Sequence, residues 1–209
     1  MDPSDYFRTL LGVVSEESGF HFPDRELQAV LDPVDGSTNA SHGLPWFATS
    51  IAVMDEAGIR VAMVANQATY ECFQAVRGAG TTLNGRPIAP TPCESLSQAV
   101  VGMSGWPRRH LGWGQFRAYG AVALDLCAVA CGRFDGYFDA GSAGHAPWDY
   151  LGGLLICQEA GVPVVDLNGR NLATAGLHDR RVLVAAATPT LMGDLLTARR
   201  SMIDPDPGR

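Results

Sequence analysis

The sequence contains no lysine, because all 15 of its basic residues are arginine. Catalysis through a lysine nucleophile or a lysine Schiff base is therefore excluded. Cysteine is scarce as well: the five cysteines are an odd number, and none of them forms a Cys-x-x-Cys pair. Disulfides and structural zinc are accordingly not expected. Cys127 and Cys131 lie four residues apart in a predicted helix, which indicates packing of small side chains.

The chain also lacks an apolar run of membrane-spanning length, since Asp125 interrupts its most hydrophobic predicted helix. It opens without a signal-peptide pattern, so we expect a cytoplasmic protein with no membrane partner. Acidic residues outnumber basic ones by 22 to 15, and the resulting net charge of −7 argues against a nucleic-acid partner. With 209 residues, 46% of them hydrophobic, the chain can form one large or two small domains.

The most informative segment that is present is 32–38, Asp-Pro-Val-Asp-Gly-Ser-Thr. The apolar stretch 27–31 precedes it and predicts a short strand that ends at Asp32. Pro33 fixes its own φ angle and favours an extended conformation in the residue before it. The sequence therefore predicts a strand that stops at a defined corner.

Such a corner lets Asp32, the Val34 carbonyl and Asp35 converge on one point. Gly36 permits backbone angles that other residues avoid, and Ser37 or Thr38 could cap a following helical turn. Oxygen ligands beside free backbone N–H groups suit a divalent cation that bridges to a phosphate. An ordinary Asp-Pro turn is the alternative interpretation.

Two other places in the chain favour the cation site. Glu16 and Glu17 form an acidic pair upstream, which on its own would indicate a solvated loop or helix end. Asp149 opens a segment with apolar residues at helical spacing that ends at Gly161. Asp149 would thus lie in the first helical turn, where capping the helix is its ordinary role.

The spacing of apolar residues and turn signals predicts an alternation of sheets and helices. Short connections argue for antiparallel pairing of the first long strands, and Asn84-Gly85 indicates a tight turn. The predicted helices cover 4–13, 121–131, the segment from 149, and 189–200, and the strands lie near 27–31, 47–55, 60–66, 70–77, 99–103, 134–138, 162–165 and 182–186. A linker near 89–92 divides the chain into halves 1–92 and 93–209, which we expect to form one compact unit.

Several motifs in this order resemble those of the inositol monophosphatase family, whose members are magnesium-dependent, lithium-sensitive phosphomonoesterases. The resemblance extends from about Val14 to about Thr188. The matching segments are 15–18, 32–39, 42–52, 75–80, 83–88, 124–133, 148–149 and 159–161. The resemblance implies the family's layered α/β fold, an α/β/α/β/α sandwich, here without its usual N-terminal helices.

Electrostatics support a metal site on independent grounds. Two carboxylates about 4 Å apart repel each other by roughly 4 kcal/mol at an effective dielectric constant of 20. A helix dipole offsets only about 0.3–1 kcal/mol. Either the four acids are scattered in the fold, or divalent cations hold them together in one pocket. Oxygen-only ligation favours magnesium over zinc.

By resemblance, Glu16, Asp32 and the Val34 carbonyl would hold one Mg²⁺, and Asp32, Asp35 and Asp149 a second. Asp32 would bridge the pair, and Glu16 would help to place a possible third ion. The backbone N–H groups of Gly36 and Ser37 would receive the phosphate, with Asp149 beside the substrate. Metal-activated water would hydrolyse the phosphomonoester, so the catalytic residues implied are Glu16, Asp32 and Ser37.

In the family, the hydroxyl at the position of Ser37 is supported by an aspartate from helices upstream of the acidic pair. Asp2 and Asp5 are poor substitutes by their spacing, and loss of such support commonly costs 10–100-fold in activity or metal affinity. The alternative to an active phosphatase is thus a weak or inactive member that binds metal, a phosphorylated ligand or a protein partner.

The substrate is less well defined. Gly120-Ala121 stands where the family usually has Gly-Ser or Gly-Thr, so a hydroxyl that could contact a sugar ring is missing. Asp139 and His145 are candidates to line the pocket, whereas Trp46 and Trp148 indicate packing. Inositol monophosphate or a related sugar or polyol phosphate is the leading substrate, and fructose-1,6-bisphosphate, histidinol phosphate and adenosine 3′,5′-bisphosphate compete with it. The resemblance also suggests a homodimer.

Overall fold

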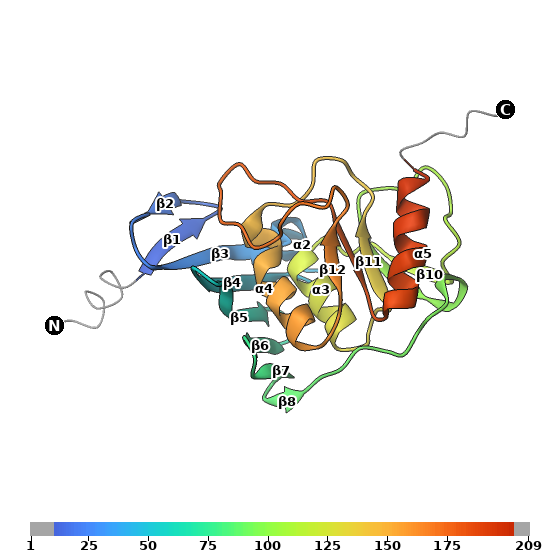
Figure 1. The fold of residues 1–209 in the computed structure, drawn as a ribbon, viewed down its shortest axis with the longest axis horizontal. Coiled ribbons are helices and arrows are strands. Elements are labelled where there is room, and N and C mark those ends of the chain that lie inside the picture. Colours follow the sequence, from blue (N-terminus) through green and yellow to red (C-terminus); the bar gives the residue numbers. More distant parts are fainter. Residues whose placement is uncertain (1–10, 203–209) are drawn as a thin grey trace.

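The structure is a computed structural model, and it describes residues 11–202. Its strands form two sheets (Figure 1). The larger sheet has eight strands in the order β2-β1-β3-β4-β5-β6-β7-β8. These are β1 (Leu11–Ser15), β2 (Gly19–His21), β3 (Leu27–Asp35), β4 (Ala48–Asp55), β5 (Gly58–Asn66), β6 (Cys72–Val76), β7 (Gly80–Leu83) and β8 (Arg86–Pro87).

The smaller sheet has five strands in the order β10-β9-β11-β13-β12. Its members are β9 (Val100–Ser104), β10 (Gln115–Arg117), β11 (Gly136–Asp139), β12 (Val164–Asp166) and β13 (Leu183–Ala186). The helices are α2 (Ser37–His42), α3 (Val122–Ala130), α4 (Pro147–Glu159) and α5 (Pro189–Arg200), with a 3₁₀ turn η1 at Leu96–Gln98.

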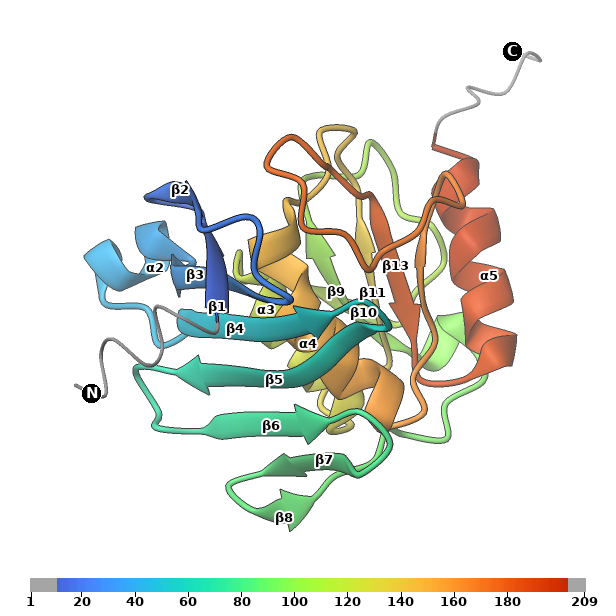
Figure 2. The ribbon, with the colours of Figure 1, turned by 60° about the vertical axis from the view of Figure 1, so that its left-hand side comes forward.

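The elements are stacked in layers (Figure 2). Helices α3 and α4 lie between the two sheets, and α5 covers the outer face of the smaller sheet. One apolar core fills the space around α3 and α4, and a second lies between the smaller sheet and α5. Residues 11–202 thus form sheet, helix, sheet and helix layers in turn, as a layered α/β fold requires.

Local sequence explains these positions. Strand β4 alternates buried and half-buried residues along its whole length, which is the pattern of a strand with one face on the core. Every residue of α3 is buried, because this helix has a sheet on each side. The antiparallel pairing of β4, β5 and β6 and the helices over 121–131 and 189–200 were expected, and the structure has them. Asn84 and Gly85, both at positive φ, form the predicted tight turn between β7 and β8.

Two local predictions were wrong. Residues 11–13, assigned to a helix over 4–13, belong to β1, which runs parallel to β3; residues 4–10 lie outside the described range. The strand before Asp32 does not stop at Pro33 but continues to Asp35 as β3. The division into halves 1–92 and 93–209 stays a prediction. Among residues 11–202, no helix is both long and apolar enough to cross a membrane.

Pro33 fits inside β3 because the pairing with β4 is irregular there. Asp32 pairs with Ser50 and Asp35 pairs with Ala48, so two residues of β3 face only one residue of β4. This bulge removes the need for an N–H group at Pro33, which has none to donate. It also carries both aspartates to the end of the strand, where the candidate site lies.

Candidate functional site

All seven residues predicted for the site line one pocket of about 250 Å³. Sequence positions more than a hundred residues apart meet here, because β1, β3, α2 and α4 all contribute side chains at one end of the layers. The predicted residues are Glu16, Asp32, Val34, Asp35, Gly36, Ser37 and Asp149, and the pocket is completed by Ser104, Gly120, Val122 and His145.

Three of the four carboxylates are held by backbone N–H groups. Asp32 Oδ1 accepts from the N–H of Val34 at 2.8 Å, within the bulge. Asp35 Oδ2 accepts from Ala123 N–H at 2.8 Å and so caps the start of α3. Asp149 Oδ2 accepts from Ala146 N–H at 2.8 Å at the start of α4. Each carboxylate therefore has a fixed position and a second oxygen that is not engaged in that bond.

Burial and mutual repulsion disfavour the charged form of these acids. Burial, and next the charge of Glu16, raises the pKa of Asp32 to about 7. Burial raises the pKa of Asp35 well above its usual range, although the Ala123 N–H opposes that shift. The pKa of Glu16 is also raised, first by burial and then by the charge of Asp149. Asp32 and Asp35 are only 2% and 8% exposed, so water screens them poorly.

This donor set fits a hard divalent cation. The pocket offers carboxylate oxygens, no arginine is among its lining residues, and the raised pKa of Asp32 is consistent with a site that a cation would stabilise. In the part of the chain that the structure describes, no three acidic, histidine or cysteine side chains already stand close enough to form a metal-binding cluster.

Gly36 joins the corner to α3. Its φ of 84° lies in the left-handed region, and it forms the N-cap of α2 without a side-chain cap, so the expectation that Ser37 or Thr38 caps this helix was wrong. A Cβ atom at this position would lie 3.0 Å from the Ala121 Cβ and 3.0 Å from the Trp46 carbonyl oxygen. Only glycine fits both the backbone angle and the space, as segment 32–38 predicts.

A network that the sequence did not predict lies on the far wall of the pocket. The buried Tyr137 hydroxyl donates to Ser104 Oγ at 2.8 Å and lies 3.0 Å from His145 Nε2. His145 Nδ1 is 3.7 Å from Asp149 Oδ2, and its Nε2 is 3.7 Å from Asp139 Oδ2. The pocket position considered for His145 is confirmed, whereas Ser104 and Tyr137 carried no local signal.

The two tryptophans near the motifs pack as expected. Trp46 donates from Nε1 to Asp125 Oδ1 at 2.9 Å, and Trp148 is buried beneath the Arg180 guanidinium. The matching segment around Glu159 also has a structural role. Its two carboxylate oxygens accept from the N–H groups of Gly78 and Gly80, both at 2.8 Å, and thereby tie α4 to the turn before β7.

Comparisons with known proteins agree with this geometry. The model of the inositol monophosphatase family matches residues 8–204. The "Nus factor SuhB" of Vibrio cholerae is 39% identical over 173 residues, which is 75% of this chain and 63% of that protein. The "Nus factor SuhB" of Pasteurella multocida is 36% identical over 200 residues, 88% of this chain and 72% of that protein. The chain thus spans about two thirds of the length of these relatives.

A solved structure gives the same result for the fold. The inositol monophosphatase of Anabaena (Nostoc) sp. superposes on this chain with a TM-score of 0.80 and is 28% identical to it. The superposition covers 95% of this chain and 81% of the Anabaena chain. The relatives named as Nus factors give no support to the expectation that nucleic acid is absent from the partners. Fold and sequence nonetheless agree on the family. The chain belongs to the inositol monophosphatase family.

Proposed function

We propose that the protein is a magnesium-dependent phosphomonoesterase for a small sugar or polyol phosphate, with inositol monophosphate as the first substrate to test. The observation that supports this most strongly is the pocket itself. Glu16, Asp32, Asp35 and Asp149 meet there beside the turn that begins α2, although their carboxylates repel one another. An arrangement that costs free energy in the absence of a cation is readily explained by cation binding.

Different residues of the pocket would bind each metal ion. Glu16, Asp32 and the Val34 carbonyl would hold one Mg²⁺, and Asp32, Asp35 and Asp149 another. Bound magnesium would neutralise the phosphate and lower the pKa of a coordinated water. The three aspartates, each fixed by a backbone N–H, keep the ligand oxygens in place without rearrangement.

Phosphate binding and water positioning fall to the turn after β3. Gly36 and Ser37 line the pocket at the start of α2, and their N–H groups would donate to phosphate oxygens. Ser37 is exposed, and within residues 11–202 its hydroxyl forms no hydrogen bond, so it can bind the attacking water. Glu16, whose raised pKa makes it a better base, would assist in accepting the proton.

Phosphate release from a panel of phosphomonoesters, with magnesium and with or without lithium, tests the proposal. Asp149→Asn should remove most activity yet keep the fold, because an amide oxygen can still accept from Ala146. Glu16→Gln should lower activity strongly, whereas Glu17→Gln, a matched exposed neighbour that does not line the pocket, should not. Release of no phosphate from any substrate at millimolar magnesium would refute the proposal.

A binding role without useful turnover is the second candidate, and the name Nus factor of the relatives favours it. The same panel of phosphomonoesters distinguishes a phosphatase from a binding protein. A protein that binds magnesium or inositol monophosphate by calorimetry, but releases phosphate no faster than Asp149→Asn, is a binding protein.

A further inference from the structure

The segment between Glu94 and Asp125 contains no acidic residue, although the whole chain has a net charge of −7. The same segment contains Arg108, Arg109 and Arg117. Acidic and basic residues are therefore separated along the chain. Such separation gives part of the surface a local electrostatic potential, which the net charge of the whole chain does not describe.

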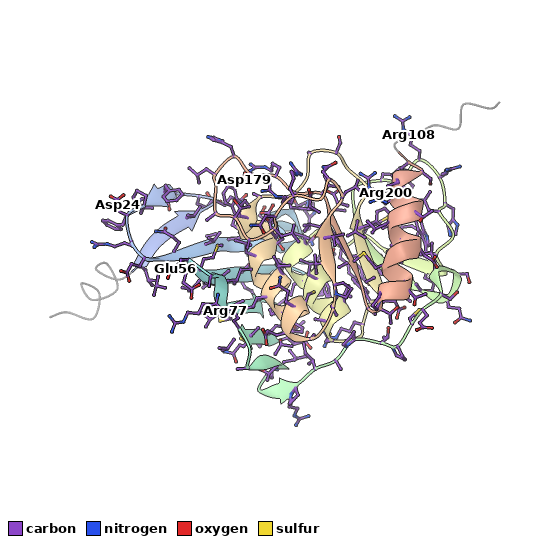
Figure 3. All side chains as sticks on the ribbon, in the orientation of Figure 1. Asp24, Glu56, Arg77, Arg108, Asp179 and Arg200 are labelled. Atoms are coloured by element: carbon purple, nitrogen blue, oxygen red, sulfur yellow. The ribbon has the colours of Figure 1, made fainter. Side chains whose placement is uncertain are left out.

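The fold places part of this segment beside the C-terminal end of α5. Arg109 donates to the Ser201 carbonyl at 3.3 Å, and Arg108 and Arg200 lie at the same end of the molecule (Figure 3). We call the surface formed here the aromatic–arginine patch. Its members are Trp106, Arg108, Arg109, Phe116 and Arg200.

The aromatic members of the patch are unusually exposed. Trp106 is 76% exposed and Phe116 is 40% exposed. The edge of one ring meets the other at 6.3 Å between centroids, and Phe116 rests in turn on the buried Trp113 at 6.1 Å. The pair is thus supported from the protein side while the Trp106 ring stays accessible from solvent. An exposed indole of this kind is typical of a binding surface.

A hollow of about 390 Å³ lies next to the Trp106 ring, and Arg108 and Met202 contribute to its walls. Its floor is built by Arg199, which is only 4% exposed. The Arg199 guanidinium donates to the carbonyls of Asp139 and Gly141, and so fixes the shape of the loop after β11. The hollow is therefore a formed feature of the fold.

The arginines of the patch carry positive charge that is available to a ligand. Among the described residues, 11–202, no carboxylate forms an ion pair with Arg108, Arg109 or Arg200. The helix dipole at the C-terminal end of α5 accounts for Arg200, and Arg109 donates to the carbonyl of the C-cap residue Ser201. Neither contact neutralises a guanidinium charge. Guanidinium groups without a carboxylate partner around an exposed indole are complementary to a polyanion that carries flat rings.

We infer that the aromatic–arginine patch binds single-stranded nucleic acid. One base stacks on Trp106 at the mouth of the hollow, and Arg108, Arg109 and Arg200 contact the phosphates on either side. A duplex keeps its bases stacked on each other and cannot offer a face to Trp106, which gives the preference for single strands. The inference does not depend on the phosphatase proposal, because none of the patch residues lines the acidic pocket.

Fluorescence anisotropy of labelled oligonucleotides of about 12 nucleotides tests this inference. RNA, DNA and a duplex of the same sequence form the three arms, with the whole chain as the protein. Binding of either single strand, tighter than the duplex, is expected. Three phosphate contacts predict that the logarithm of the association constant falls with the logarithm of the salt concentration with a slope of about −2.

Variants make the test specific. Trp106→Ala should weaken binding by roughly tenfold or more through loss of stacking. The double variant Arg108→Ala, Arg109→Ala should reduce the salt slope to about −0.7, one remaining contact. Tyr70→Ala is the matched control, since Tyr70 is 86% exposed but lies in the turn between β5 and β6, far along the chain from the patch. Its affinity should equal that of the unaltered protein.

Three results would overturn the inference. The first is no change in anisotropy for either single strand at low salt. The second is equal binding by the Trp106→Ala variant and the unaltered chain. The third is displacement of the oligonucleotide by polyglutamate as readily as by unlabelled RNA, which would indicate a general anion site or an acidic protein partner. The urea unfolding midpoint of Trp106→Ala should stay close to that of the unaltered chain, which shows that this variant is folded.

Discussion

In the acidic pocket, three aspartates are each fixed by a backbone N–H, and all are crowded by neighbours of the same charge. In the aromatic–arginine patch, the charged groups lie on the surface, and no described carboxylate pairs with them. The pocket therefore presents rigid ligands at a cost in folding free energy, while the patch presents surface charges at little cost. The first arrangement suits a small ion of strict geometry, and the second suits a flexible polymer.

Asp35 should show the largest effect, because it both caps α3 and lines the pocket. Asp35→Asn keeps an acceptor for Ala123 and removes the charge, so magnesium-dependent activity should fall by more than about 100-fold while stability is kept. Asp35→Ala should lose a similar amount of activity and also about 0.5–2 kcal/mol of stability through loss of the cap. Urea unfolding and phosphate release measure the two effects. Equal stability of the Asn and Ala variants would contradict the capping role.

Magnesium should stabilise the protein more at pH 8 than at pH 6. With a pKa of about 7, Asp32 holds a proton at pH 6 that it must release before it binds a cation. Apparent magnesium affinity should thus rise with pH by up to about tenfold per unit below pH 7. Melting curves with and without magnesium at both pH values test this. The variant Arg108→Ala, Arg109→Ala should show the same difference, since the patch takes no part in it.

A substitution of Asp125, which belongs to neither the acidic pocket nor the aromatic–arginine patch, should have an intermediate effect. Burial raises its pKa to about 8; one oxygen accepts from Trp46, and the other has no partner among the described residues. The folded state holds this proton up to about pH 8, whereas the unfolded chain loses it near pH 4, so stability falls as the pH rises between these values. In the Asp125→Asn variant the free energy of unfolding should decrease less steeply with rising pH, by up to about 1.4 kcal/mol per pH unit. Urea unfolding at pH 5 and pH 8 measures it, and an unchanged slope would exclude Asp125 as its source.

The smallest effect on stability is expected in the patch itself. The double variant Arg108→Ala, Arg109→Ala should change the free energy of unfolding by no more than about 0.5 kcal/mol, because exposed charges without partners contribute little. A loss of several kcal/mol would show that these arginines are structural and would remove the contrast with the pocket.

The sequence was sufficient to predict residues that share one pocket, because Asp32 and Asp35 lie three residues apart at the end of β3 and the resemblance adds Glu16 and Asp149. The roles of these residues stay a prediction. The layered fold followed from the same resemblance. The helix predicted over 4–13 was wrong at residues 11–13, whose apolar pattern suits either a helix or a buried strand. These residues form a strand because they pair with β3.

Other features could not be predicted because they arise from contacts distant in sequence. Tyr137 joins Ser104 and His145 only after β9 and β11 lie side by side. The patch requires α5 to bring Arg200 beside Arg109, more than ninety residues earlier in the chain. Net charge is a single sum over all residues, so it could not reveal that Arg108 and Arg109 share a surface on which no carboxylate of residues 11–202 pairs with them.

The close approach of Gly36 to Ala121 bears on attempts to redesign the pocket. A library that varies position 121 to introduce a ring-binding hydroxyl also pushes against the glycine of the turn proposed to bind phosphate, since a Cβ at Gly36 would already lie 3.0 Å from the alanine methyl. Changes intended for specificity at this position would therefore appear as changes in turnover. Selection schemes should vary 121 together with the start of α3, so that the helix can shift and leave the turn where it is.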